Sequence, residues 1–237
     1  MIEIKDVTKK YGAKTAVDQV SFTAAPGRVT GFLGPNGAGK SSTLRILLGL
    51  DQATSGTALI DGQPYPSLTQ PMRTVGAILD GASAVPERRG VDHLRWLAQS
   101  NRIGSQRIGE VLETVGLADA AKVRVRKYSL GMKQRLGLAA ALLGEPRILV
   151  LDEPVNGLDP EGIRTIRGFL RRYAEQGNTV LLSSHLMGET AETVDDIVII
   201  DKGRIIATGE LGEITDGHAS LEEAFFSLTS SQPGQSW

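Results

Sequence analysis

The chain has 237 residues, of which 41% are hydrophobic and 22% are charged, a composition typical of an ordinary globular protein large enough to bury a core. Its 26 basic and 27 acidic residues almost balance, so no charge pattern points to a nucleic-acid partner. The chain contains no cysteine, which excludes disulfides and cysteine-ligated metals and fits a reducing compartment.

The N-terminal third is expected to be mostly β structure. Residues 1–8 (MIEIKDVT) and 16–24 (AVDQVSFTA) alternate apolar and polar side chains, as half-buried strands do. Charge begins at Glu3, and no uncharged apolar run approaches the roughly 18 residues of a membrane-spanning helix, so we expect neither a signal peptide nor a membrane span. A short apolar strand, a helix, a hairpin arm and a buried strand follow at residues 27–34, 41–50, 55–63 and 73–80.

Between about residues 84 and 144 the pattern changes to helices. Residues 91–101 form one predicted helix. Residues 105–117 form a second, whose apolar face consists of Ile108, Val111, Leu112 and Val115. A third begins at Ser129, whose hydroxyl can cap the N-terminus of an alanine- and leucine-rich run. Such a helix end, with small neighbours, is suited to bind an anion.

After Pro146 the pattern returns to alternating strands and helices. Residues 147–154 (RILVLDEP) include a continuous apolar run, which is typical of a buried parallel strand. Residues 160–177 form an amphipathic helix that Pro160 opens and Gly177 closes. Three strands and a helical patch follow at residues 178–185, 196–201, 203–209 and 220–228, before a polar end expected to be loose.

Together these patterns predict an α/β fold with a parallel-sheet core, extra antiparallel strands near the N-terminus and an inserted α-helical subdomain. The predicted core comprises residues 1–83 and 145–210, the insertion residues 84–144, and the helical C-terminal tail residues 211–237. Ligands of open α/β sheets bind at the carboxyl ends of the strands, so candidate functional residues are sought at that edge.

A glycine-rich loop follows the first short apolar strand. Residues 34–42 (GPNGAGKSS) fit the phosphate-loop pattern G-x-x-x-x-G-K-[ST]. Glycines let the loop turn its N–H groups inward around phosphate, Lys40 places a charge against the β- and γ-phosphates, and Ser41 offers a hydroxyl ligand to Mg²⁺. A glycine-rich turn with a chance lysine is the alternative, and the strand before the loop and the helix after it argue against this. The predicted ATP-binding positions are Gly34, Pro35, Asn36, Gly37, Ala38, Gly39, Lys40, Ser41 and Ser42.

Two carboxylates and a histidine follow buried strands at the same predicted edge. Asp152 can hold Mg²⁺, and Glu153 can orient and polarise the water that attacks the γ-phosphate. A solvated strand end closed by Pro154 is the alternative. His185 can hydrogen-bond the γ-phosphate and steady the water, although a lone histidine is more often a surface or core residue. Glu153 and His185 are therefore the predicted catalytic residues, and Asp152 joins Ser41 as a predicted metal ligand.

These motifs occur together with YSLGMKQR at residues 128–135, NGLDP at residues 156–160 and SSH at residues 183–185. In this order and at these separations they resemble the nucleotide-binding subunit of an ATP-binding cassette (ABC) transporter, from the Tyr11 region to about Thr208. The resemblance implies a P-loop NTPase (RecA-like) core. The SLG signature and the LEEAF tail are similar to those of the single-cassette ATPases of bacterial drug, antibiotic or bacteriocin exporters.

The resemblance also implies roles for residues outside the phosphate loop. Tyr11 would stack its ring on adenine, unless it is only an aromatic residue at a strand end. Ser129 and Gly131 would belong to the signature motif, and Leu158 and Asp159 to the loop that links two active sites. Two chains would pack head to tail as a homodimer, with ATP between the phosphate loop of one chain and the signature motif of the other. Ser129, Gly131 and Asp159 are therefore expected to contact nucleotide.

The sequence departs from the family pattern in two places. The usual signature is L-S-G-G-Q, whereas Tyr128, Leu130 and Met132 replace its leucine, first glycine and glutamine; the serine and second glycine remain. A glutamine that usually follows the strand after the hairpin is absent from residues 71–98, and the strand ends in Asp80 instead. Asp80 can ligate Mg²⁺, but an ionised carboxylate cannot donate a hydrogen bond. The alternative is that Asp80 is a loop residue and that nothing replaces the glutamine.

The resulting hypothesis is an ATPase that hydrolyses ATP to power an ABC transporter, in the first place an exporter, as a cytoplasmic subunit on the inner face of the cell membrane. Its partner would be a separate integral membrane permease, whose cytoplasmic helix meets residues 84–127. The turn at Pro86 to Arg89 is a candidate contact, unless it is a plain solvated loop. The alternative function is a soluble ABC-type ATPase that acts on a macromolecular partner such as a ribosome or an assembly scaffold. A small-molecule kinase is a third reading, but it would need neither the signature helix nor a glutamate poised for water.

Overall fold

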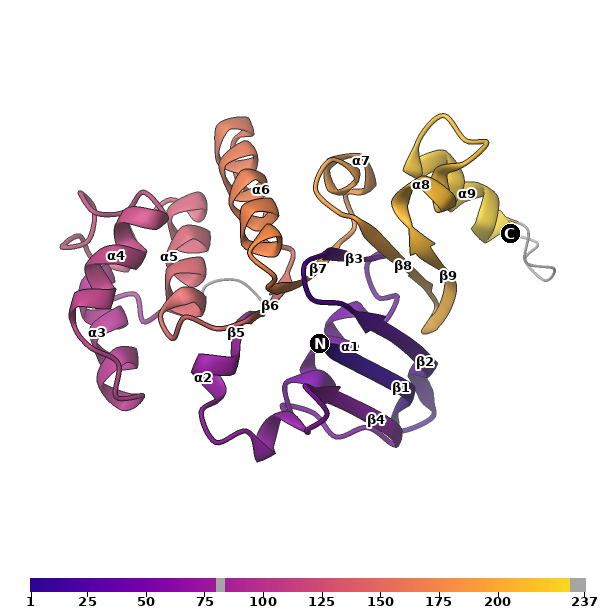
Figure 1. The fold of residues 1–237 in the computed structure, drawn as a ribbon, viewed down its shortest axis with the longest axis horizontal. Coiled ribbons are helices and arrows are strands. Elements are labelled where there is room, and N and C mark those ends of the chain that lie inside the picture. The colour runs from indigo at the N-terminus through magenta and orange to yellow at the C-terminus, as the bar shows by residue number, and fades with distance from the viewer. Residues whose placement is uncertain (80–83, 231–237) are drawn as a thin grey trace. The chain divides into compact units, whose positions relative to one another are not determined.

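The computed structural model describes residues 1–79 and 84–230, and Figure 1 labels its helices and strands in chain order. The chain divides into two compact units. The first unit comprises residues 1–67 and the chain from Arg167 onward, and the second comprises Leu68–Ile166. The subdomain boundaries expected at residues 84 and 144 stay a prediction.

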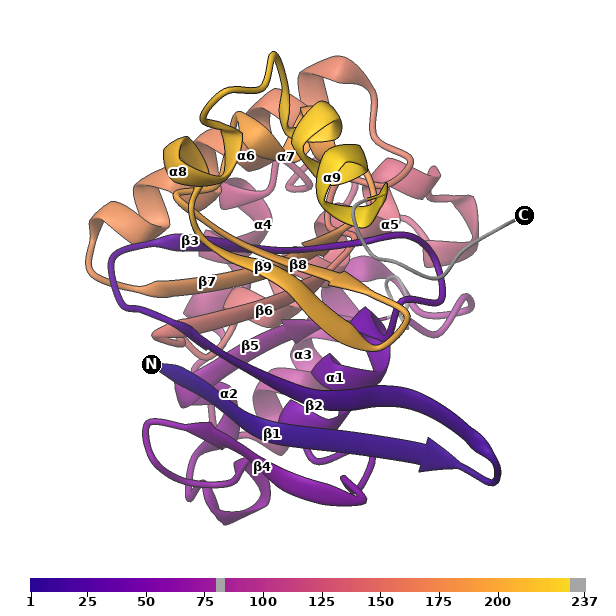
Figure 2. The same ribbon diagram turned by 90° about the vertical axis from the view of Figure 1, so that its right-hand side faces the viewer.

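The first unit contains an antiparallel sheet of three strands, visible side by side in Figure 2. Its order is β2 (Lys14–Ala24), β1 (Ile2–Tyr11) and β4 (Ser55–Ile60). The register between β1 and β2 runs from the pair Ile2 and Ala24 to the pair Tyr11 and Lys14. Helix α1 (Lys40–Leu47) contacts all three strands. The antiparallel strands predicted near the N-terminus are therefore confirmed.

The second sheet of this unit is mainly parallel. Its order is β7 (Thr179–Ser184), β3 (Val29–Leu33), β8 (Asp196–Asp201) and β9 (Arg204–Glu210), and only β9 runs antiparallel to its neighbour. Every residue of β3 and β7 is buried, as expected for parallel strands covered on both faces. The short helices α7 (Met187–Ala191) and α8 (Leu211–Thr215) and the tail helix α9 (Leu221–Ser230) complete the unit.

The second unit combines two strands with a helical cluster. Strand β5 (Val75–Ile78) pairs in parallel with β6 (Ile148–Asp152), whose five residues are all buried. The helices of this unit are α2 (Pro71–Thr74), α3 (Gly90–Ser100), α4 (Gln106–Thr114) and α5 (Leu130–Leu142), and α3, α4 and α5 contact one another. The predicted apolar face of α4 is confirmed, since Ile108, Val111, Leu112 and Val115 are all buried.

Helix α6 (Pro160–Glu175) contains the point at which the chain passes from the second unit to the first. Short 3-10 turns at Tyr65–Ser67 and Val125–Lys127 were not predicted.

Within residues 1–79 and 84–230, no helix combines the length and the apolar character needed to span a membrane. Most of the polar end expected to be loose lies outside the described residues.

Candidate functional site

The predicted phosphate loop connects β3 to α1 in the first unit. Gly37 and Gly39 adopt left-handed backbone angles, with φ of 81° and 112°, which residues with a side chain rarely adopt. Gly34 is required for another reason, because a Cβ there would lie 2.1 Å from the carbonyl oxygen of Ile200 at the end of β8. Both requirements follow from a loop that turns sharply between a buried strand and a helix. The expected strand–loop–helix context is therefore present.

Lys40 is buried at the first position of α1, with 5% of its surface exposed. Its ammonium group donates hydrogen bonds to the carbonyl oxygens of Gly34, at 2.6 Å, and Pro35, at 3.2 Å. The positive end of the α1 dipole lies at the same position, and Ser41 and Ser42 form the rest of the first turn. A lysine charge and a helix N-terminus that converge on a glycine loop form an arrangement suited to a phosphate group.

His185 lies at the edge where the phosphate loop begins. Strands β3 and β7 pair in parallel with Leu33 opposite Ser184, and the Gly34 N–H donates to the Ser184 carbonyl oxygen at 3.3 Å. The Leu186 N–H donates to the Ser184 hydroxyl at 3.0 Å, which tightens the turn around the histidine. The first unit therefore brings His185 beside the start of the loop, as the sequence predicted.

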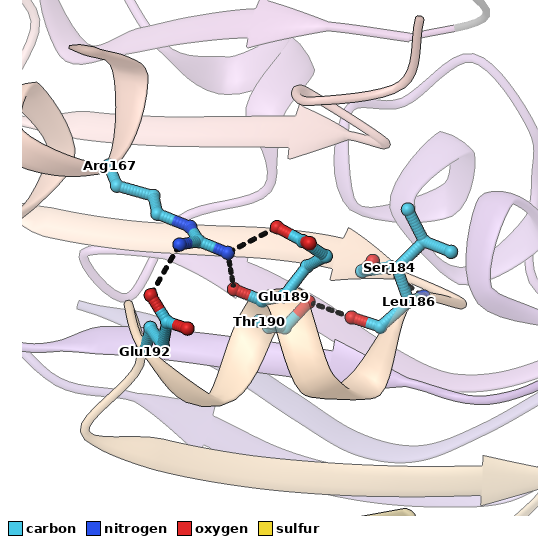
Figure 3. Close-up of polar contacts among 6 residues, drawn as sticks. All are labelled: Arg167, Ser184, Leu186, Glu189, Thr190 and Glu192. Carbon is cyan, nitrogen blue, oxygen red and sulfur yellow. Dashed lines mark hydrogen bonds and ion pairs between the residues drawn. The ribbon is translucent and has the colours of Figure 1, made fainter. Parts of the chain in front are cut away.

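Helix α7, which follows His185, is tied to α6 by one arginine. Figure 3 shows Arg167 between Glu189, which belongs to α7, and Glu192, which follows that helix. Its guanidinium donates to the Glu192 carboxylate at 2.5 Å, to the Glu189 carbonyl oxygen at 2.6 Å and to the Glu189 carboxylate. The Thr190 hydroxyl donates to the Leu186 carbonyl oxygen at 2.7 Å within the same helix. Sequence reasoning missed Arg167, since its partners lie too far along the chain to form a local pattern.

Tyr11 is a half-exposed ring at the end of β1 in the first unit. Its hydroxyl donates to the Asp51 carboxylate at 3.1 Å, and Arg45 donates to the same carboxylate at 2.9 Å. The Arg45 hydrogen bond is the main reason why the pKa of Asp51 lies below its usual value. The Lys9 ammonium lies 4.9 Å from the ring centroid and covers one face. The arrangement holds the ring in place, and sequence reasoning gave no signal for Asp51.

The second unit carries the two predicted carboxylates at the end of β6. Asp152 is the last residue of that strand and is 5% exposed. Glu153 follows with φ of 51°, a left-handed backbone conformation that is strained for a residue with a side chain. Such strain persists only where the surrounding structure imposes it, and it is frequent at functional sites. The backbone thus turns abruptly at the residue predicted to activate water.

The predicted signature and linking residues meet in one hollow of the second unit, with a volume of about 460 Å³. Ser129 caps α5 as predicted, since its hydroxyl accepts from the Met132 N–H at 3.2 Å. Asp159 caps α6 in the same manner and accepts from the Gly162 N–H at 2.9 Å. The residues that line the hollow are Ser129, Leu130, Gly131, Arg135, Gly157, Leu158, Asp159, Glu161, Gly162 and Thr165.

Leucine side chains pack closely against two glycines of this hollow. A Cβ at Gly157 would lie 2.1 Å from the Leu130 side chain, and a Cβ at Gly131 would lie 3.1 Å from the Leu158 side chain. Leu130 is nevertheless 58% exposed. The departure from the family signature at this position therefore adds an exposed apolar side chain beside Ser129, and leaves the serine cap intact.

Among the described residues, each unit carries one oxygen-bearing side chain that the sequence predicts as a magnesium ligand. Ser41 and Asp152 offer hydroxyl and carboxylate oxygens, the ligand types that Mg²⁺ prefers. No group of three or more His, Asp or Glu residues within the described ranges could hold a metal ion by itself. Mg²⁺ usually binds through one or two protein ligands together with phosphates and water, so each of these side chains has the chemistry that a nucleotide-bound ion requires. Asp80, the third predicted ligand, lies outside the described residues.

Comparisons with known proteins agree with this geometry. The family described as ABC transporter matches residues 17–156 of the chain. The chain is 40% identical over 229 residues to the uncharacterized ABC transporter ATP-binding protein YhcH of Bacillus subtilis, covering 95% of this chain and 74% of that protein. It is 36% identical over 225 residues to the lantibiotic transport ATP-binding protein SrtF of Streptococcus pyogenes, covering 95% of this chain and 96% of that protein.

Two solved structures share the fold. The ATP-binding subunit of an ABC transporter matches with a TM-score of 0.87 and 28% identity, over 97% of this chain and 99% of that one. The dimeric structure of MJ0796, a bacterial ABC transporter cassette, matches with a TM-score of 0.80 and 25% identity, over 89% of this chain and 99% of that one. The predicted fold class is therefore confirmed.

Proposed function

Because the chain belongs to the ABC transporter family and is an ATP-binding and ATP-hydrolysing subunit, we propose that it drives an exporter whose membrane-spanning part is a separate chain. The observation that carries the proposal is the similarity to SrtF, a protein named for lantibiotic transport. This similarity extends over nearly the full length of both proteins. The chain then works as a cytoplasmic subunit on the inner face of the cell membrane.

The phosphate loop binds the ATP that powers this cycle. Backbone N–H groups of the loop, except at Pro35, surround the β- and γ-phosphates, and the Lys40 ammonium exchanges its backbone carbonyl partners for phosphate oxygens. Tyr11 stacks on adenine with the face that Lys9 leaves open. Ser41, Asp152 and Asp80 would hold a Mg²⁺ ion, which would supply positive charge to the phosphates. Support for this arrangement comes from the strand–loop–helix context and from the buried lysine.

Hydrolysis depends on two side chains, each of which follows the carboxyl end of a buried strand. Glu153 orients the attacking water and accepts its proton, because a carboxylate beside the γ-phosphate is a suitable general base. His185 hydrogen-bonds the γ-phosphate and fixes the position of the water. The strained backbone of Glu153 and the tight turn around His185 support these roles, since both constrain the direction of the side chain.

Two copies of the chain close head to tail around ATP. The N-terminus of α5, with Ser129 at its cap and Gly131 in its first turn, faces the γ-phosphate held by the partner's phosphate loop. Asp159, which lines the same hollow, links the two sites. ATP binding closes this dimer and hydrolysis reopens it, so the permease is driven if it distinguishes the two states. The dimeric state of MJ0796 supports this arrangement.

The permease is expected to meet the turn Pro86–Arg89. Arg88 places its guanidinium 4.9 Å from the ring centroid of Trp96, a half-exposed residue of α3, which gives the turn an apolar and cationic surface. We favour this reading over a soluble ATPase that acts on a ribosome or a scaffold, because the similarity to SrtF is to a transport protein.

The test is affinity purification of the full-length tagged chain from detergent-solubilised membranes, with identification of the bound proteins. A multi-spanning membrane protein is expected with the wild type, and its recovery should fall with Arg88→Glu/Arg89→Glu. Arg73→Glu, an exposed change in α2, is the matched control and should retain the partner. Recovery of ribosomal or other soluble complexes, without any integral membrane protein, would contradict the transport proposal.

A further inference from the structure

Tyr128 and Gly90 meet inside the second unit. Tyr128 is 5% exposed, and Gly90 is the buried first residue of α3. A Cβ at Gly90 would lie 2.3 Å from the Tyr128 hydroxyl oxygen, 3.2 Å from the ring carbon that carries it and 3.5 Å from the Ala121 carbonyl oxygen. Only a glycine leaves room for the phenol here, so the first residue of α3 and Tyr128 are in close contact.

The hydroxyl oxygen of Tyr128 is itself tethered. It donates a hydrogen bond to the Ala120 carbonyl oxygen at 2.8 Å. Burial raises the pKa of the phenol, so the hydroxyl stays neutral and keeps its proton for this bond. A tyrosine side chain has only two rotatable bonds, and in a packed interior it cannot swing aside freely. A new methyl group at Gly90 would therefore displace the ring and the backbone that carries it.

Backbone hydrogen bonds connect the same two segments. The Gly90 N–H donates to the Val123 carbonyl oxygen at 3.2 Å, and the Val91 N–H donates to the Ala121 carbonyl oxygen at 2.9 Å. In the other direction, the Val125 N–H donates to the Arg88 carbonyl oxygen and the Arg126 N–H donates to the Pro86 carbonyl oxygen, both at 2.9 Å. The turn before α3 and residues 120–128 are thus one connected piece of structure. The permease-facing turn and the residue before Ser129 belong to this piece.

We propose that Tyr128 is a positioning residue, which fixes Ser129 relative to the first turn of α3 through its contact with Gly90. This inference rests on the proposed function, because it assumes that Ser129 serves the nucleotide of a second copy. Ser129 is the next residue in the chain and caps α5, so a displaced Tyr128 displaces the helix N-terminus that faces the γ-phosphate. A movement of the turn at Pro86–Arg89 reaches Ser129 by the same route.

The test is a double-mutant cycle with Gly90→Ala and Tyr128→Phe. Relief of the clash moves the ring by about 1 Å, and misplacement of this size is expected to lower ATPase turnover roughly tenfold or more in Gly90→Ala. Tyr128→Phe alone keeps the ring and should lose little turnover. In Gly90→Ala/Tyr128→Phe the clashing oxygen is gone, so most of the turnover should return. Gly109→Ala in α4, where a Cβ meets no atom within 4 Å, is the matched control and should behave as wild type.

A second readout separates positioning from general damage to the fold. Gly90→Ala should leave the ATP affinity of the single chain unchanged, because the phosphate loop belongs to the first unit. In the Glu153→Gln background it should weaken ATP-dependent dimer formation, and Tyr128→Phe should restore it. If Gly90→Ala is insoluble, Tyr128→Ala is measured instead, and the same loss of dimer formation at unchanged ATP affinity is expected.

Two results would overturn the inference while the proposed function stands. One is a folded Gly90→Ala protein, or a Tyr128→Ala protein, with turnover within about twofold of wild type. The other is a loss of turnover that Tyr128→Phe fails to restore. If the Glu153→Gln chain with intact Gly90 and Tyr128 does not dimerise with ATP, the proposed dimer cycle is wrong and the inference falls with it.

Discussion

The Lys40 ammonium donates a hydrogen bond to the Gly34 carbonyl oxygen at 2.6 Å, so the first and seventh residues of the phosphate loop are joined across its interior. A neutral carbonyl is a weaker partner for an ammonium group than a phosphate oxygen, which carries charge. ATP binding is therefore expected to draw Lys40 from the loop backbone to the nucleotide. The buried position of the lysine means that this exchange takes place out of bulk water, where charge–charge attraction is strong.

Lys40→Ala is expected to weaken ATP binding about tenfold or more, because it removes a charge-assisted hydrogen bond to phosphate. Equilibrium titration with a fluorescent ATP analogue measures the loss. Lys5→Ala, which removes an exposed lysine on β1, is the control and should bind normally. Equal affinity of Lys40→Ala and wild type would mean that the loop does not hold the phosphates.

His185→Ala is expected to bind ATP normally and to lose turnover about 100-fold, since it removes a group that steadies the γ-phosphate and the water. Steady-state hydrolysis and equilibrium binding, measured on the same preparation, separate the two effects. His218→Ala is the matched control, because it changes a histidine of the same unit outside the sheet edge. A turnover like that of wild type in His185→Ala would remove the histidine from the proposed chemistry.

Tyr11→Ala is expected to weaken ATP binding about tenfold, because stacking on an aromatic ring contributes roughly 1–3 kcal/mol per base. Tyr11→Phe keeps the ring and loses only the hydrogen bond to Asp51, so most of the affinity should remain. Affinity for inorganic tripolyphosphate, which has no base, should be the same in all three proteins. If Tyr11→Ala binds ATP as tightly as wild type, Tyr11 is only an aromatic residue at a strand end.

His93, on α3, predicts a pH dependence of stability. Burial, and to a smaller extent the Arg88 charge, hold the pKa of His93 below its usual value of 6.5. The unfolded chain therefore takes up the proton first as the pH falls, and stability that is complete above pH 6.5 is lost below it. From about pH 7.5 to about pH 5.5 the melting temperature should fall further in wild type than in His93→Leu. Parallel melting curves for the two proteins would show that the folded protein tolerates the charge.

The elements that the sequence predicts well are those in which the spacing of apolar residues along the chain indicates which side chains are buried. The apolar face of α4 and the continuous run of β6 are local patterns, and both are buried as expected. Ser129 was recognised as a helix cap for the same reason, since a cap depends on residues three positions apart. The 3-10 turn at Val125–Lys127 has no such pattern, and it follows from hydrogen bonds to the turn before α3.

The functional motifs could be recognised from residue types in short windows, but the contacts that hold them could not. Asp51 beside Tyr11 and Arg167 beside α7 join positions that are distant in the chain, so only the folded structure brings them together. The meeting of Gly90 with Tyr128 is of the same kind. The left-handed backbone of Glu153 is also invisible in the sequence, because glycine is the residue that usually marks such a conformation.

In the proposed cycle, ATP closes a dimer, and hydrolysis that depends on Glu153 reopens it. The most direct measurement is the mass in solution of Glu153→Gln, determined by light scattering with and without ATP. We expect a dimer with ATP, a monomer without it and almost no hydrolysis, because the closing contacts survive while water activation is lost. A Glu153→Gln protein that stays monomeric with saturating ATP and hydrolyses it at the wild-type rate would show that this dimer cycle is wrong.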